Sequence, residues 1–360
     1  MRGSRRWTAL AATAAACTIG LTSCSGADYG NGTVGSLTAI GSSTEKASIT
    51  AWQQGWTKDF PQTSLRYSPD GDATGREALT LGMAHFASLD SQLTAEDWER
   101  SKAACGPEGA FAVPTSVTAI GVAYNVAGLR NVKLDQSVLA AIFQGGITKW
   151  NDPEIAAINP GVTLRDTKIV PIWVKAQSGL TQAVGEYLQT SAGNAGKSPT
   201  GGRWPESTPG ESVPAYADVA KKLDDTAGAI AFMDHAAIGT RFSTAALKFS
   251  DDFVKASDDA LAAAIAGADI GEGPGGGVSL TLQTGSGPGY PLGVVSYQAY
   301  CHEYKNPAIA RLVKSWATYV LGEGGQANST FFAQVGSPNS KALAISKAAI
   351  ARIKAQNNDK

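Results

Sequence analysis

The feature that most constrains the fold is an apolar strand followed at once by a turn and a helix, within residues 169–188. Residues 169–174 are mostly apolar, which is typical of a buried strand. The helix that follows carries one apolar face, made of Leu180, Val184, Tyr187 and Leu188. Ser178 then takes the N-cap position, where free amide groups and the helix dipole favour an oxyanion. An ordinary capped turn explains this segment equally well.

Strands and helices alternate along the rest of the chain. We expect further strands at residues 37–40, 65–67, 85–90, 117–124, 228–232 and 292–300. We expect helices after residues 45, 75 and 94, and near 134–143, 180–189, 213–223, 309–319 and 342–353, with a loop at 271–277. This alternation predicts an α/β protein whose parallel or mixed sheets are flanked by helices.

Polar residues stand in four of the predicted strand-to-helix turns, namely Ser43, Asp72, Asp90 and Ser178. Ligands of such sheets bind beyond the carboxyl ends of the strands, so these residues are expected to line one cleft. The same turns hold possible helix starts. Ser42 with Glu45 has the spacing of a capping box, and Thr94 is expected to cap the helix near Asp97.

Length and composition limit the function classes. A chain of 360 residues is long enough for two compact domains. Charged residues make up 17% and the net charge is −1, so no basic surface indicates nucleic-acid binding. Three histidines argue against a His-based metal site, and no cofactor is expected. The hydrolase elbow G-x-S-x-G, the zinc motif H-E-x-x-H and the redox motif C-x-x-C are absent, so no catalytic residue is assigned.

The N-terminus has the pattern of a bacterial lipoprotein signal, residues 1–24. Basic residues come first, an apolar run extends from Ala9 to Leu21, and small residues then precede Cys24. A transmembrane anchor is the alternative, but this run is too short to span a bilayer. The pattern predicts lipid on Cys24, a flexible tether over residues 25–36, and a protein held at the extracytoplasmic face of the membrane.

The cysteines follow from this prediction. Cys17 leaves with the signal and Cys24 carries the lipid, so Cys105 and Cys301 remain. In an exported protein, two remaining cysteines favour a disulfide. Two buried free thiols are the alternative.

Several short motifs of the chain are specific enough to indicate a known family. The most specific is the run Gly145-Gly146-Ile147-Thr148-Lys149-Trp150-Asn151-Asp152-Pro153-Glu154-Ile155, followed by Asn159-Pro160. Shorter matches are Gly41-Ser42-Ser43, Asp90-Ser91, Ser178-Gly179 and Asp225-Thr226-Ala227-Gly228-Ala229-Ile230. Together these motifs resemble the phosphate-binding lipoprotein family of the Pst ABC importer. The resemblance extends from about residue 37 to the C-terminus.

The resemblance implies a two-lobed periplasmic-binding-protein fold of type II, whose chain crosses a hinge twice. Lobe one would comprise residues 37–116 and 291–360, and lobe two residues 117–290. The crossings would fall near residues 114–117 and 290–293. Lobe one would then hold both Cys105 and Cys301, which suits a bridge within that lobe.

The resemblance also implies which residues bind the ligand. The first turn would supply Ser43, Thr44 and the backbone of Glu45. Asp72 stands where the family has a Ser, and Asp90 matches the acidic residue that accepts the proton of phosphate and so rejects sulfate. The loop of lobe two would supply Ser178, Gly179 and Leu180.

The ligand loop departs from the family pattern. Val174, Ala176 and Leu180 stand where the family has Arg, Asp and Thr, so the bidentate donor for an anion is lost. Asp72 would add a carboxylate beside Asp90, and two charges ~4 Å apart at an effective dielectric of about 20 repel by roughly 4 kcal/mol. A register shifted by one residue would place Lys175 in the role of the Arg, although Lys175 and Val174 point to opposite faces of a strand. Arg76 is the other candidate for compensation.

These residues lead to one main functional hypothesis and two alternatives. We expect the substrate-binding component of a phosphate-type ABC importer, without enzymatic activity, whose partners are the permease and ATPase subunits. The first alternative keeps the scaffold but binds a neutral or cationic solute, or serves as a surface interaction protein. The second is a secreted hydrolase that uses Asp72 and Asp90 as an acid/base pair.

Overall fold

The computed structural model describes residues 33–189, 198–285 and 287–356. Residues 33–360 form one compact unit. The predicted signal, Cys24 and most of the predicted tether lie outside the described residues. β1 already begins at Gly35, inside the range expected for the tether. Within the described ranges, no helix combines the length and the apolar character needed to span a membrane.

The first group of elements contains the part of the main sheet whose strands lie in the order β2-β1-β3-β14-β4. Its strands are β1 (Gly35–Gly41), β2 (Thr63–Ser68), β3 (Phe86–Leu89), β4 (Ala110–Tyr124) and β14 (Gly293–Cys301). β1 is parallel to β2 and β3, and β14 is antiparallel to β3 and β4. Its helices are α1 (Lys46–Asp59), α2 (Asp72–Thr80), α3 (Ala95–Cys105), α10 (Pro307–Leu321), α11 (Glu323–Ala333) and α12 (Ser340–Ala351). Two short pairs accompany it, β12 (Asp269–Gly273) with β13 (Gly277–Thr281), and β15 (Glu303–Tyr304) with β16 (Lys354–Ala355).

The second group continues the same sheet through β4-β8-β6-β7. Its strands are β6 (Val170–Val174), β7 (Glu211–Val213), β8 (Ala229–Asp234) and β9 (Ser243–Thr244). A three-stranded sheet joins β5 (Lys133–Leu134), β10 (Ala246–Phe249) and β11 (Asp252–Lys255). The helices are α4 (Gln136–Gln144), α5 (Pro153–Ala157), α6 (Gly179–Gln189), α7 (Val219–Asp225), α8 (His235–Ile238) and α9 (Asp258–Ala266), with 3₁₀ turns η1 (Tyr216–Asp218) and η2 (Pro274–Gly276).

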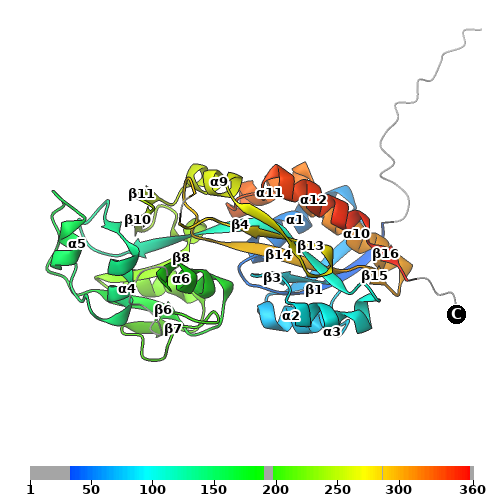
Figure 1. Ribbon diagram of the computed structural model, residues 1–360, viewed down its shortest axis with the longest axis horizontal. Coiled ribbons are helices and arrows are strands. Elements are labelled where there is room, and N and C mark those ends of the chain that lie inside the picture. Colours follow the sequence, from blue (N-terminus) through cyan, green and yellow to red (C-terminus); the bar gives the residue numbers. More distant parts are fainter. Residues whose placement is uncertain (1–32, 190–197, 286, 357–360) are drawn as a thin grey trace, which may run out of the picture. The chain divides into compact units, whose positions relative to one another are not determined.

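The long strand β4 connects the two groups, as Figure 1 shows. Its residues 110–119 pair with β14, and its residues 120–124 pair with β8. Every residue of β4 is buried, because the strand lies in the core of both lobes. Leu261 of α9 and Leu280 of β13 pack into the core of the first lobe, although both lie inside the range predicted for lobe two. The predicted lobe boundaries at 116/117 and 290/291 stay a prediction.

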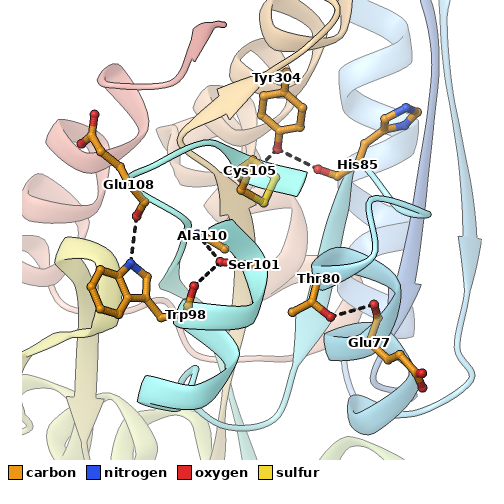
Figure 2. The surroundings of a disulfide bond; sticks show 10 residues. Glu77, Thr80, His85, Trp98, Ser101, Cys105, Glu108, Ala110 and Tyr304 are labelled. Carbon is orange, nitrogen blue, oxygen red and sulfur yellow. Dashed lines mark hydrogen bonds between the residues drawn. A yellow bond between two sulfur atoms is a disulfide. The ribbon is translucent and has the colours of Figure 1, made fainter. Parts of the chain in front are cut away.

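A disulfide fixes the edge of lobe one (Figure 2). It joins Cys105, the last residue of α3, to Cys301, the last residue of β14. The two cysteines are 196 positions apart in the sequence. The Tyr304 hydroxyl donates to the carbonyl oxygen of His85 at 2.7 Å and accepts from the Cys301 amide at 3.1 Å. The bridge inferred from the cysteine count is therefore formed, and the free-thiol alternative is wrong.

Some local predictions were wrong for identifiable reasons. The Gly-rich loop expected at 271–277 is the hairpin β12–β13 with its turn. The helix expected at 213–223 begins only at Val219, because β7 ends at Val213. β4 begins seven residues before the expected Val117. Pro114, a strand breaker in sequence, lies beside a register shift at which Thr115 of β4 has no partner on β14.

Two predicted helix starts had opposite outcomes. Thr94 and Asp97 form a complete capping box at the start of α3, as expected. Ser42 and Glu45 do not, because α1 begins at Lys46 with Glu45 as its N-cap and no side-chain cap bond. The Ser42 hydroxyl is instead directed to the carboxylate of Asp90.

Candidate functional site

The turn between β1 and α1 presents two hydroxyl groups to one carboxylate. Ser42 is buried, and its Oγ donates to Asp90 Oδ1. Thr44 Oγ1 donates to Asp90 Oδ2 at 3.4 Å, while the Thr44 amide donates to Ser42 Oγ at 3.0 Å. Ser43, the hydroxyl that the resemblance implies, is exposed. Within this turn, the residue that contacts Asp90 is Ser42, while the implied role of Ser43 in binding a ligand stays a prediction.

Asp90 also contacts the opposite lobe directly. It follows β3, and its Oδ2 accepts a hydrogen bond from the Gly179 amide, the first residue of α6, at 3.1 Å. A Cβ atom added to Gly179 would lie 2.1 Å from the Cβ of Asp90. Only glycine allows this approach, so the two lobes meet backbone to side chain at this point.

The charge state of Asp90 reflects this enclosure. Burial raises the pKa of its carboxyl, and the nearby charge of Asp72 raises it as well, to a net value of about 6. The hydrogen bonds from Ser42, Gly179 and Thr44 lower it again, which keeps the pKa from rising more. At neutral pH the carboxylate is therefore ionised and stabilised by neutral donors from both lobes.

The start of α6 is capped as the sequence predicts. Ser178 Oγ accepts a hydrogen bond from the Thr181 amide at 3.1 Å, which makes Ser178 the N-cap. The Ser178 amide itself donates to the carbonyl oxygen of Gly202 at 3.0 Å. Thr181 Oγ1 lies 2.8 Å from the hydroxyl of Tyr216, a residue that no sequence motif singled out. Leu180, the third residue expected of this loop, is buried among apolar side chains.

The position of the lost Arg is filled by the apolar core. Val174 is 1% exposed and packs in the same cluster as Ile172 and Val213. Lys175 is exposed and lines a separate pocket together with Arg203. Because Lys175 lines that separate pocket and Asp90 does not, its position argues against the shifted register.

Asp72 and Arg76 pair with each other. Asp72 begins α2, and its Oδ2 lies 2.7 Å from Arg76 Nε. Arg76 Nη1 also pairs with Asp97 Oδ2 at 2.6 Å. The other oxygen of Asp72 accepts from the Asp90 amide at 2.9 Å. Asp72 thus orients the Asp90 backbone, its charge is compensated by Arg76, and this engagement argues against an acid/base pair of Asp72 with Asp90.

The side chain of Glu45 makes contacts beyond the backbone role that the resemblance implies. Its side chain is 1% exposed and accepts hydrogen bonds from Thr115 Oγ1, on β4, and from Gln298 Nε2, on β14, the latter at 3.4 Å. Burial raises the pKa of Glu45 to about 8. The residue therefore joins the ligand turn of lobe one to both strands that lead toward lobe two.

A pocket of about 340 Å³ opens beside the Asp90–Gly179 contact. Its walls combine apolar side chains of β13 and β14, such as Leu280 and Val294, with the α6 face that carries Glu186. Among the described residues that line it, none is basic. This pocket offers room for a solute next to the converging donors.

Comparison with known proteins identifies the family of this chain. A family model described as the PBP superfamily domain matches residues 26–323. The chain belongs to this superfamily. The two-lobed α/β fold expected from the sequence is thereby confirmed.

Relatives and solved structures agree with this assignment. "Phosphate-binding protein PstS 3" of Mycobacterium leprae is 29% identical over 301 residues, covering 81% of this chain and 79% of the relative. "Phosphate-binding protein PstS2" of Mycobacterium bovis is 28% identical over 337 residues, covering 86% and 89%. A phosphate-binding protein from Stenotrophomonas maltophilia superposes with a TM-score of 0.65 at 18% identity, covering 90% of this chain and 97% of the other. A high-affinity periplasmic phosphate-binding protein with bound phosphate gives 0.67 at 18% identity, covering 87% and 93%.

Proposed function

We propose that this protein is the extracytoplasmic solute-binding component of a phosphate-type ABC importer and takes inorganic phosphate between its lobes. The observation that carries the proposal is the convergence of the Ser42 and Thr44 hydroxyls and the Gly179 amide on one pair of carboxylate oxygens. Such a neutral donor set at the start of an 11-residue helix suits an oxyanion. The names of the curated relatives, quoted above, point to phosphate as that oxyanion.

Each predicted ligand residue has a role in this proposal. Ser42 and Thr44 donate from lobe one, with Ser43 at the exposed end of the same turn. Gly179, Ser178 and the backbone of Leu180 form the α6 side. Asp90 accepts a proton from the ligand, while Asp72 and Glu45 hold the surrounding backbone and network in place.

The missing Arg lowers the expected affinity. A hydrogen bond to a charged group contributes about 1.5–3 kcal/mol, and a bidentate Arg makes two of them. Because 1.4 kcal/mol is a factor of ten in affinity, we expect binding at least about 100-fold weaker than a site that keeps this Arg. This protein is therefore proposed as a weaker phosphate binder.

The remaining parts of the proposal concern its setting. The predicted signal would place the protein outside the membrane, tethered by lipid on Cys24. The permease and ATPase subunits of the importer would be its partners. It would bind and release its ligand by movement of the lobes, without enzymatic activity.

The proposal is tested by isothermal titration calorimetry on the chain from residue 25 onward, after bound ligand is removed by dialysis under mild denaturation. We expect saturable binding of phosphate with one site per chain and little response to sulfate. Lys175→Ala is the matched control, because Lys175 lines a different pocket, and its affinity should equal that of the parent. Absence of heat up to millimolar phosphate would rule the proposal out.

One observation favours a second candidate function. The interlobe pocket carries the carboxylates of Asp90 and Glu186 and no basic side chain, which suits a cationic or neutral solute. A thermal-shift series with simple amines, neutral sugars and phosphate distinguishes the two. Stabilisation by an amine and not by phosphate would favour this alternative.

A further inference from the structure

The donors that an anion would use are held by a side chain of the protein itself. The Asp90 carboxylate accepts from Ser42 and Thr44 of lobe one and from Gly179 of lobe two. The first amides of a helix have no acceptor within the helix, so Asp90 supplies the acceptor that Gly179 otherwise lacks. The contact is as close as backbone geometry permits, since a Cβ on Gly179 would overlap Asp90.

We propose that Asp90 is an internal occupant of the anion site, which bridges the lobes and must leave Gly179 before a ligand anion can take that amide. The inference rests on the proposed function for the identity of the ligand, but the bridge itself does not depend on it. It assigns Asp90 a second role, as a competitor for the ligand, beside that of accepting the ligand's proton.

The surroundings of Asp90 support an exchange of one anion for another. The described residues place no lysine or arginine in hydrogen-bond or ion-pair contact with its carboxylate. The titratable groups near it are Glu45 at the start of α1, Tyr67 of β2, Asp72 of α2 and Tyr216 of η1. None of them adds a positive charge, so nothing near the Gly179 amide favours its sharing by two anions.

This arrangement makes the binding of a ligand a replacement. An incoming oxyanion gains the Gly179 amide and the positive end of α6, and Asp90 loses them. The net free energy of binding is therefore the difference between the contacts that the oxyanion gains and those that Asp90 loses. This loss lowers the affinity in addition to the missing Arg. Removal of Asp90 should free the amide of its acceptor within the protein when no phosphate is present.

The decisive experiment follows the exchange of the Gly179 amide hydrogen by NMR in the chain from residue 25 onward, without phosphate. In Asp90→Ala we expect this amide to exchange at least tenfold faster than in the parent. The Thr181 amide, held by Ser178 within the same lobe, should keep its rate and serves as the internal control. Glu186→Gln removes a carboxylate further along α6 and should change neither rate. Asp90→Leu repeats the test with a side chain of similar shape that has no hydrogen-bond acceptor.

The outcomes separate this inference from the proposed function. Equal rates for Gly179 in the parent and both Asp90 variants would overturn the internal occupant, as would parallel acceleration of Gly179 and Thr181. If phosphate binds Asp90→Ala by calorimetry, it should slow the Gly179 exchange again, and binding without slowing would also overturn the inference. If phosphate binds neither protein while Gly179 still accelerates, the internal occupant stands and phosphate is excluded as the ligand.

Discussion

The two sides of the cleft contribute different kinds of groups to the proposed anion site. The lobe-one side is dense in polar groups, with Ser42, Thr44 and Asp90 hydrogen-bonded to one another. The lobe-two side presents the capped start of α6. Val174, at the position where the resemblance implies an Arg, packs in the apolar core. Anion recognition on the lobe-two side therefore depends on backbone geometry, and on the lobe-one side on side-chain hydroxyls.

The largest effect is expected from restoring the charge on the lobe-two side. Val174→Arg would place an unpaired guanidinium in a buried apolar cluster, which costs about 3–5 kcal/mol. Urea denaturation should show this loss in the free energy of unfolding. Lys175→Arg, at the exposed neighbour, should change it by less than about 0.5 kcal/mol. If Val174→Arg keeps full stability and tightens phosphate binding, the lobe-two side has retained room for the Arg.

Next in size is the backbone contact between the lobes. Gly179→Ala adds a Cβ that would lie 2.1 Å from the Cβ of Asp90, so the two sides have to separate. We expect phosphate affinity to fall about 100-fold by calorimetry, equal to roughly 2.7 kcal/mol. Gly324→Ala is the control, because an added Cβ there meets nothing within 4 Å. Unchanged affinity in Gly179→Ala would show that the ligand does not use this contact.

The third prediction concerns Glu45 on the lobe-one side. Its pKa is raised to about 8, so the folded protein holds this proton more tightly than the unfolded chain does. The resulting stability is present below the unfolded value of 4.5 and is lost as the pH rises toward 8. From about pH 6.5 to 8.5 we expect the free energy of unfolding to fall by roughly 2 kcal/mol.

A substitution isolates this pH effect. Glu45→Gln should remove most of the slope, because the amide keeps the shape and does not titrate. The pKa of Asp90, raised to about 6, adds a slope of the same sign in the lower part of this range. An unaltered slope in Glu45→Gln would assign the pH dependence to other groups.

The smallest effect separates two adjacent serines. Ser42→Ala removes a hydroxyl donor of Asp90 and should weaken phosphate binding about tenfold, or roughly 1.4 kcal/mol. It should also raise the pKa of Asp90, because this hydrogen bond lowers it. Ser43→Ala, at the exposed neighbour, should have little effect. A larger loss of phosphate affinity in Ser43→Ala than in Ser42→Ala would indicate that Ser43, the residue that the resemblance implies, contacts the ligand.

The sequence predicts those features that depend on local patterns. The 3.6-residue spacing and the preference of Ser for the N-cap identified α6 and Ser178. The count of cysteines that remain after the predicted signal identified the bridge between Cys105 and Cys301. The alternation of side chains along a strand correctly separated Lys175 from Val174.

Features that depend on long-range packing were not accessible in this way. Ser42 and Ser43 are chemically identical, and only the direction in which β1 enters the turn decides which one meets Asp90. Arg76 pairs with Asp97 across 21 positions, so no local pattern showed that it was already engaged. The contact between Asp90 and Gly179 spans 89 positions and arises only when the two lobes come together.

The most direct test of the central claim is a phosphate titration of the isotope-labelled chain from residue 25 onward, followed through the amide resonance of Gly179. If phosphate replaces Asp90 on that amide, the resonance should move and saturate with the same dissociation constant that calorimetry gives. A Gly179 resonance that stays in place up to millimolar phosphate would contradict the claim that this cleft binds phosphate by exchange with Asp90.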